Sequence, residues 1–211
     1  MATALTALRS LVQVNAPGCP LPIVDFAILN ALIDFFARSR AYRYTPAQIT
    51  VVSGTAEYVP TIPDGVEIAW LLDAELDETE NSLSCVPPDE IPVLWATEQG
   101  TPTLAALVNP TTVGLRKVPD ASGTLDLRVA LRPTDGCTEY PDEFHVLYRE
   151  QLAAGALARL YDMPNRPWSA PNSVASAKAN FERAVLDAEY RADRGASNAP
   201  TRTKLCLIGG R

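Results

Sequence analysis

The hydrophobic pattern of residues 22–40 predicts an α-helix that is apolar around most of its circumference. One stripe at helical spacing contains Val24, Ile28, Ala31, Leu32 and Phe35. A second stripe contains Phe26, Leu29, Ile33 and Phe36. The remaining polar strip holds Asp34 and Arg38 at the i,i+4 spacing of an ion pair. Two interpretations fit: a helix deep inside its own core, or one whose second stripe contacts another subunit.

The middle of the chain, residues 46–136, alternates between short apolar runs and turn residues, which predicts strands. The runs cover residues 48–54, 66–76, 81–86, 103–108, 113–118 and 123–133. In the last run, Leu125, Leu127, Val129 and Leu131 occupy every second position and so share one face, as expected for a half-buried strand. Strands at this spacing suggest a small sandwich or barrel.

Two further helices are predicted after residue 137. The first covers residues 142–162, with Asp142 and Glu143 in the first turn, where the helix dipole favours carboxylates. The second begins with Asn172 or Ser173 as N-cap and ends at Gly195. Its apolar stripe is narrow, so most of its surface should be solvated.

The stretch "EQLAAGALARLYDMPNRPWSAPN" (150–172) joins these helices. Its small residues allow neighbouring helices to approach closely, and Gly155 gives up about 1 kcal/mol of helix propensity relative to alanine. Pro164 and Pro167 stop the helix and force an extended link. We expect a central hairpin whose core contains Leu152, Gly155, Leu157, Leu160, Trp168 and Phe181.

Together these elements predict an α+β fold made of a helical bundle with an inserted antiparallel β domain. Residues 1–45 and 137–195 would form a discontinuous bundle domain of one N-terminal and two C-terminal helices. Residues 46–136 would form the inserted β domain, and residues 196–211 an extended C-terminal arm.

Composition and charge narrow the function. The chain has 211 residues, 47% of them hydrophobic, and a net charge of −7. This negative charge argues against a nucleic-acid-binding protein, because such proteins bind phosphates through basic side chains. The four cysteines are scattered, which fits reduced thiols. We expect neither a targeting segment nor a membrane span.

The sequence contains no recognisable catalytic, metal or cofactor site. The single histidine, His145, is isolated from any nucleophile motif, and a zinc site would need clustered ligands. The acidic stretch 73–80 lacks the spacing of a calcium loop, so we expect an exposed hairpin edge there. We therefore predict a protein that is not an enzyme and has no cofactor.

The tail after Gly195 allows two interpretations. Two basic residues, Arg202 and Lys204, precede an apolar run of Leu205, Cys206, Leu207 and Ile208. A frayed terminus is one interpretation. We favour an arm that orders on binding another protein, because a solvated tail otherwise has little use for an apolar run.

The order of these elements resembles the head-to-tail connector adaptors of short-tailed bacteriophages, the tail tubular protein A-like group. The resemblance covers roughly residues 15–195, and its most specific piece is "LAAGALARLYDMPNRPW" (152–168). It implies a structural virion protein of the neck or tail, assembled in the host cytoplasm. About twelve copies would form a ring beneath the portal protein, extend the DNA channel and give a platform to a downstream tail or nozzle protein.

The same resemblance implies that double-stranded DNA passes through without specific binding. The portal-binding arm would then use Arg202, Lys204, Leu205, Leu207 and Ile208. The alternatives are another neck or tail-tube protein of the same particle, a DNA-packaging subunit that binds nucleic acid, and a small hydrolase with an unrecognised site.

Overall fold

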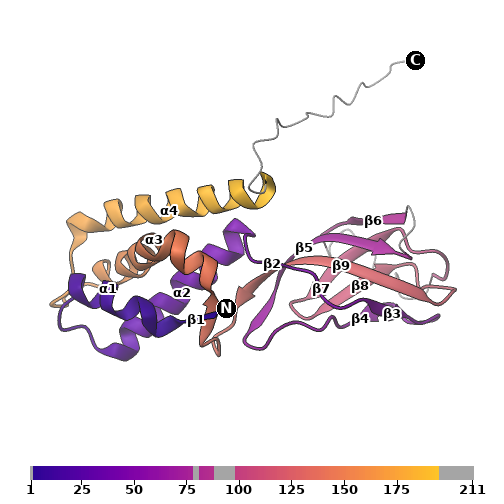
Figure 1. The fold of residues 1–211 in the computed structure, drawn as a ribbon, viewed down its shortest axis with the longest axis horizontal. Coiled ribbons are helices and arrows are strands. Elements are labelled where there is room, and N and C mark those ends of the chain that lie inside the picture. Colours follow the sequence, from indigo (N-terminus) through magenta and orange to yellow (C-terminus); the bar gives the residue numbers. More distant parts are fainter. Residues whose placement is uncertain (1, 78–80, 88–97, 195–211) are drawn as a thin grey trace, which may run out of the picture.

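The structure, a computed structural model, describes residues 2–77, 81–87 and 98–194. Helices occupy one end of the elongated molecule and strands the other (Figure 1). The described residues form four α-helices and a short 3-10 helix, Leu5–Leu8. The α-helices are α1 (Arg9–Asn15), α2 (Leu21–Ser39), α3 (Asp142–Tyr161) and α4 (Pro171–Arg194). The mixed α+β class is as predicted.

The strands are β1 (Ala2–Ala4), β2 (Arg43–Tyr44), β3 (Ile49–Val51), β4 (Glu57–Tyr58), β5 (Val66–Leu76), β6 (Asn81–Cys85), β7 (Leu104–Asn109), β8 (Thr112–Arg116), β9 (Gly123–Pro133) and β10 (Glu139–Pro141). Eight of them form one curled sheet in the order β2-β9-β5-β6-β7-β8-β4, with β3 also paired to β9. Strands β1 and β10 form a separate antiparallel pair beside the helices. The ranges predicted for β5 and β9 match to the residue.

The helical end is held by an apolar core that all four helices share. At its centre, the ring of Phe35 contacts the rings of Phe144, Tyr148 and Phe181. These rings come from α2, α3 and α4, so one residue links three helices that are far apart in the sequence. Gly155 makes the α3–α4 contact possible, because a Cβ at this position would lie 2.4 Å from Cδ2 of Phe181.

A second apolar core lies within the curled sheet. The alternating residues of β9 enter it, and Leu125, Val129 and Leu131 are fully buried there. Half-buried Tyr42 packs against both cores, at the point where the chain leaves α2 for the sheet.

The structure corrects several sequence predictions. The prediction of an entirely antiparallel sheet is wrong, because β6 pairs with β7 in parallel. Such a pair needs a long connection, and the chain between Cys85 and Leu104 is long enough. The described part of the acidic stretch does not lie on an edge strand, since Ala74–Leu76 pair with both β6 and β9; residues 78–80 lie outside the described residues.

Two further differences concern the helical end. The prediction of one N-terminal helix is incomplete, because the 3-10 helix Leu5–Leu8 and α1 precede α2, and Ala2–Ala4 form a strand that pairs with β10. Helix α4 begins at Pro171, one residue before the predicted N-cap Asn172. Proline is favourable at this position, where the helix does not need its N–H.

Candidate interaction surfaces

The outward face of α2 carries an apolar strip. Phe26 is 65% exposed, and Leu29 and Ile33 are half-buried beside it along the helix. The opposite face, from Val24 to Ser39, lies in the helical core. Because 3.6 residues complete each turn, Phe26, Leu29 and Ile33 share one side of α2.

Trp70 of β5 lies at the end of this strip and is 44% exposed. Its indole Nε1 donates a hydrogen bond to the carbonyl of Ala37 in the last turn of α2, at 2.7 Å. Register shifts occur on both sides of Trp70 in β5. Such bulges redirect side chains, which explains how a strand residue reaches the helix end.

Arg40 closes the junction between α2 and the sheet. It adopts a left-handed conformation at the C-cap, with φ of 52°. Its guanidinium carbon lies 4.4 Å from the centroid of the Trp70 ring, a cation–π geometry. The exposed apolar strip of α2 therefore continues through Trp70 onto the sheet.

Ion pairs connect α2 with α3 and α4. Arg38 makes a two-pronged contact with Glu182, with 2.8 Å between Nη1 and Oε1. Asp34 accepts from Arg159 at 3.1 Å and lies 3.8 Å from Arg38. The Arg38 guanidinium holds the pKa of the Glu182 carboxyl below its ordinary value. This pair links the outer helix α4 to α2 at the surface.

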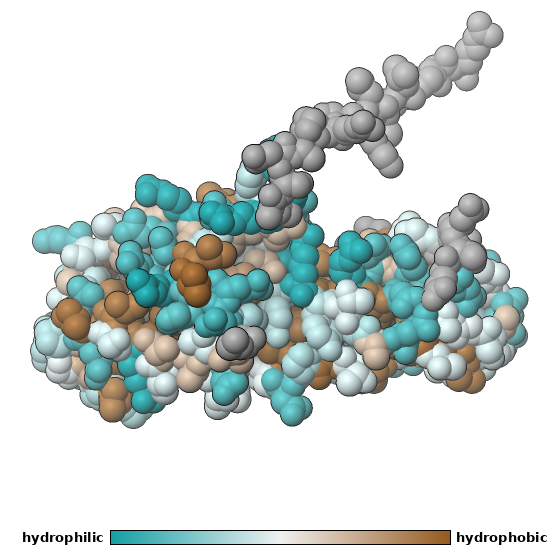
Figure 2. Space-filling model, viewed as in Figure 1, coloured by the Kyte–Doolittle hydropathy of each residue, from teal (hydrophilic) through white to brown (hydrophobic). Residues whose placement is uncertain are grey.

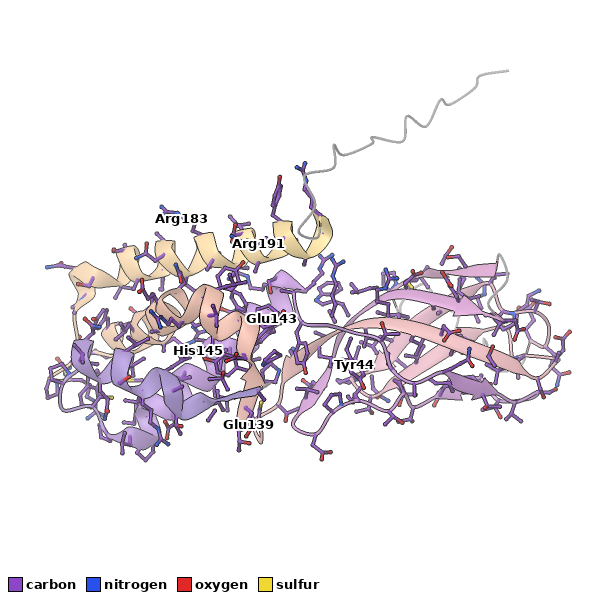
Figure 3. The ribbon with its side chains drawn as sticks, in the orientation of Figure 1. Tyr44, Glu139, Glu143, His145, Arg183 and Arg191 are labelled. Atoms are coloured by element: carbon purple, nitrogen blue, oxygen red, sulfur yellow. The ribbon has the colours of Figure 1, made fainter. Side chains whose placement is uncertain are left out.

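A groove runs between α3 and α4. Its larger hollow has a volume of about 510 Å³ and is lined by Leu147 and Ala154 from α3 and by Arg183 and Asp187 from α4. A neighbouring hollow of about 170 Å³ extends it past Arg191 toward the C-terminal end of α4. Figure 3 shows Arg183 and Arg191 on α4 and Glu143 at the start of α3.

Polar contacts form one wall of this groove. The Tyr148 hydroxyl donates to Asp187 at 2.9 Å, and Arg191 donates to the same carboxylate at 2.8 Å. Burial, together with the hydrogen bond to the Asp187 carboxylate, raises the pKa of Tyr148 to about 12. Arg183 makes no ion pair with any described residue. This arrangement positions charges but contains no nucleophile with a neighbouring base.

His145 has a structural contact. Its Nδ1 lies 2.7 Å from the hydroxyl of Tyr140, a buried residue of β10. Burial raises the pKa of Tyr140 well above its ordinary value, so this hydroxyl stays neutral. Among the described residues, no three histidine, cysteine or acidic side chains gather in a way that could hold a metal ion.

Comparison with known proteins identifies the family. A family model described as SU10 adaptor protein matches residues 2–204, nearly the whole chain. The chain belongs to the SU10 adaptor protein family. No curated protein matches it. Membership makes the chain a bacteriophage adaptor, a structural component of the virus particle.

The adaptor buries all six residues predicted for its helical core. Leu152 and Leu160 are almost completely inaccessible, and Gly155, Leu157, Trp168 and Phe181 are also buried. The inward side of the α3–α4 hairpin is therefore scaffold for the adaptor, and the groove lies on its outward side.

The predicted subunit-interface residues of the adaptor divide into two groups. Phe26, Leu29 and Ile33 share the outward face of α2. Phe36 is 0% exposed and packs against Phe35 and Phe144, so its side chain does not reach the surface. Helical spacing explains this difference, because Phe36 is displaced from Phe26 toward the buried face.

The predicted arm residues Arg202, Lys204, Leu205, Leu207 and Ile208 lie outside the described part of the adaptor. Sequence reasoning missed Trp70 and the α3–α4 groove. In the sequence, Trp70 is only an isolated tryptophan in a predicted strand, and nothing near it indicates a contact with α2. The groove arises from two helices packed side by side, and neither helix reveals it alone. In the described ranges of the adaptor, no helix is long and apolar enough to cross a membrane.

Proposed function

We propose that the chain is a head-to-tail adaptor of a short-tailed bacteriophage, similar to the tail tubular protein A-like group. About twelve copies would form a ring beneath the portal protein, extend the DNA channel and support the next tail or nozzle protein. The main support for this proposal is the match of the SU10 adaptor protein family model to residues 2–204. Assembly would take place in the host cytoplasm.

A ring of identical subunits needs two different surfaces on each subunit, which meet between neighbours. We assign the outward strip of Phe26, Leu29 and Ile33 to one of these surfaces. Support comes from the exposure of Phe26 in the isolated chain, since a large aromatic side chain gains most from burial in an interface. Trp70 extends this surface onto the sheet.

The two apolar cores support a division into two domains. We propose that residues 1–45 and 137–195 form a discontinuous helical bundle domain, and that residues 46–136 form an inserted β domain. Residues 196–211 would be an arm that binds the portal protein through Leu205, Leu207 and Ile208, beside Arg202 and Lys204.

The net charge of −7 supports a conduit, because a negative lumen does not retain passing DNA. A packaging subunit that binds nucleic acid would instead shift DNA in a salt-dependent manner. Absence of such a shift with the isolated full chain would count against that alternative.

The decisive experiment mixes the purified full chain with purified portal protein and images the product by electron microscopy. We expect a ring with the symmetry of the portal at its narrow end. A chain that never joins the portal would overturn the proposal. A ring that binds another tail component instead would favour a different neck or tail-tube protein.

A further inference from the structure

The groove between α3 and α4 contains an apolar patch among polar lining residues, and the described residues leave this patch open. Leu147 is 50% exposed, although it faces the space between two packed helices. Ala154 and Ala184 line the same hollow, and small side chains leave room for an incoming chain. Figure 2 shows apolar patches among polar residues on the helical end.

The groove ends where the C-terminal segment begins. Its smaller hollow is lined by Ala192, two residues before α4 ends at Arg194. From there the groove follows α4 back to Asn180, a distance of about 20 Å at the helical rise. The segment 195–211 extends up to ~3.5 Å per residue, so its apolar run reaches every part of the groove.

Charge favours contact with the α3 side of the groove. The segment contains Arg202, Lys204 and Arg211 and no acidic residue, in a chain with a net charge of −7. The α3 side carries Glu143 and Glu150, and neither makes an ion pair with a described residue. The α4 side is less favourable for basic residues, because Arg183 lines the groove without an ion-pair partner among the described residues.

We propose that, in the free chain, the C-terminal segment folds back and places Leu205, Leu207 and Ile208 in the α3–α4 groove of its own chain. Its basic residues then lie beside Glu143 and Glu150 on α3. This contact covers the apolar run until a competing partner removes the segment. The proposal goes beyond the ring and is tested on the isolated chain, so it stands or falls separately from the adaptor function.

Cys206 lies inside the apolar run and allows a direct test. In a full-length Cys85→Ser background, which removes the exposed thiol at position 85, two matched variants are compared. Ala154→Cys places a thiol in the groove, and Ala179→Cys places one on the outward side of α4. One thiolate attacks oxidised glutathione, which breaks its S–S bond, forms a mixed disulfide and releases one reduced glutathione. The second thiolate then attacks the mixed disulfide and releases the second reduced glutathione.

We expect the intramolecular disulfide between Cys206 and the cysteine at position 154 to form at least about tenfold faster than the one between Cys206 and the cysteine at position 179. The reason is that docking raises the effective concentration of Cys206 at the groove. Mass spectrometry identifies the linked peptides, and circular dichroism verifies that both variants fold. Adding Leu205→Glu and Leu207→Glu should reduce the groove rate to the control rate.

Equal rates at positions 154 and 179 would overturn the proposal. Cross-linked dimers that increase with protein concentration would also overturn it, because the segment would then occupy the groove of a second copy. A groove rate unaffected by the two glutamate substitutions would rule out docking of the apolar run.

Discussion

At the residue scale, Gly155 is required by the packing of α3 on α4. A methyl group there would meet the Phe181 ring at 2.4 Å, and this ring also contacts Phe35. Overpacking of a filled core costs about 1–3 kcal/mol, which exceeds the gain of about 1 kcal/mol in helix propensity from glycine to alanine.

We therefore predict that Gly155→Ala lowers the free energy of unfolding by about 1 kcal/mol, measured by urea denaturation. Gly136→Ala is the matched control, because a Cβ there has no neighbour within 4 Å. An unchanged midpoint for Gly155→Ala would mean that the Phe181 ring moves aside without cost.

Trp70 is a second residue whose role depends on its contacts. We predict that Trp70→Phe destabilises the protein by about 1 kcal/mol, through loss of the hydrogen bond to Ala37. A separate double-mutant cycle of Trp70→Leu, which removes the aromatic ring, with Arg40→Ala should reveal a coupling energy of about 0.5 kcal/mol or more from the cation–π contact. Additive effects would show that the ring and the guanidinium do not interact in solution.

At the element scale, the ion pair between Arg38 and Glu182 links the outer helix α4 to α2. The pKa of Glu182 is lowered in the folded protein, so the pair with Arg38 contributes stability above the unfolded pKa of glutamate. That contribution disappears as the pH falls through the lowered folded value. Both partners are partly exposed, so the contribution is only a few tenths of a kcal/mol.

We predict that Arg38→Gln reduces the loss of stability between pH 6 and pH 3, measured as the shift of the urea midpoint. Arg183→Gln, on α4 next to Glu182, should retain the wild-type pH dependence, because Arg183 has no ion-pair partner among the described residues. Identical pH profiles for wild type and Arg38→Gln would contradict a folded pKa shift caused by this pair.

At the scale of the whole molecule, we propose that the α2 strip is the surface through which copies of the chain assemble. We predict that Phe26→Glu changes the free energy of unfolding by less than about 0.5 kcal/mol, because the side chain is largely exposed. It should abolish ring formation on the portal, observed by electron microscopy, because a charge would be buried without a partner.

Leu186→Glu is the matched control for this experiment. Leu186 is 62% exposed and lies on the outward side of α4, away from the α2 strip. Rings should form normally with this variant. If both variants formed rings, the α2 strip would not be a subunit interface.

The sequence alone determined the elements with strong periodic patterns. The ranges of β5 and β9 were predicted to the residue, and α2 and α3 to within about one residue, because apolar spacing reports directly which side is buried. The sequence also predicted the hairpin around Gly155, because its small side chains permit close helix packing.

Only the tertiary structure decided which of these surfaces exist. It separated exposed Phe26 from buried Phe36, although both belong to the same predicted stripe. It paired Ala2–Ala4 with β10, made β6 parallel to β7, and brought Trp70 to the end of α2. These features depend on contacts between residues far apart in the chain, and local periodicity contains no information about such partners.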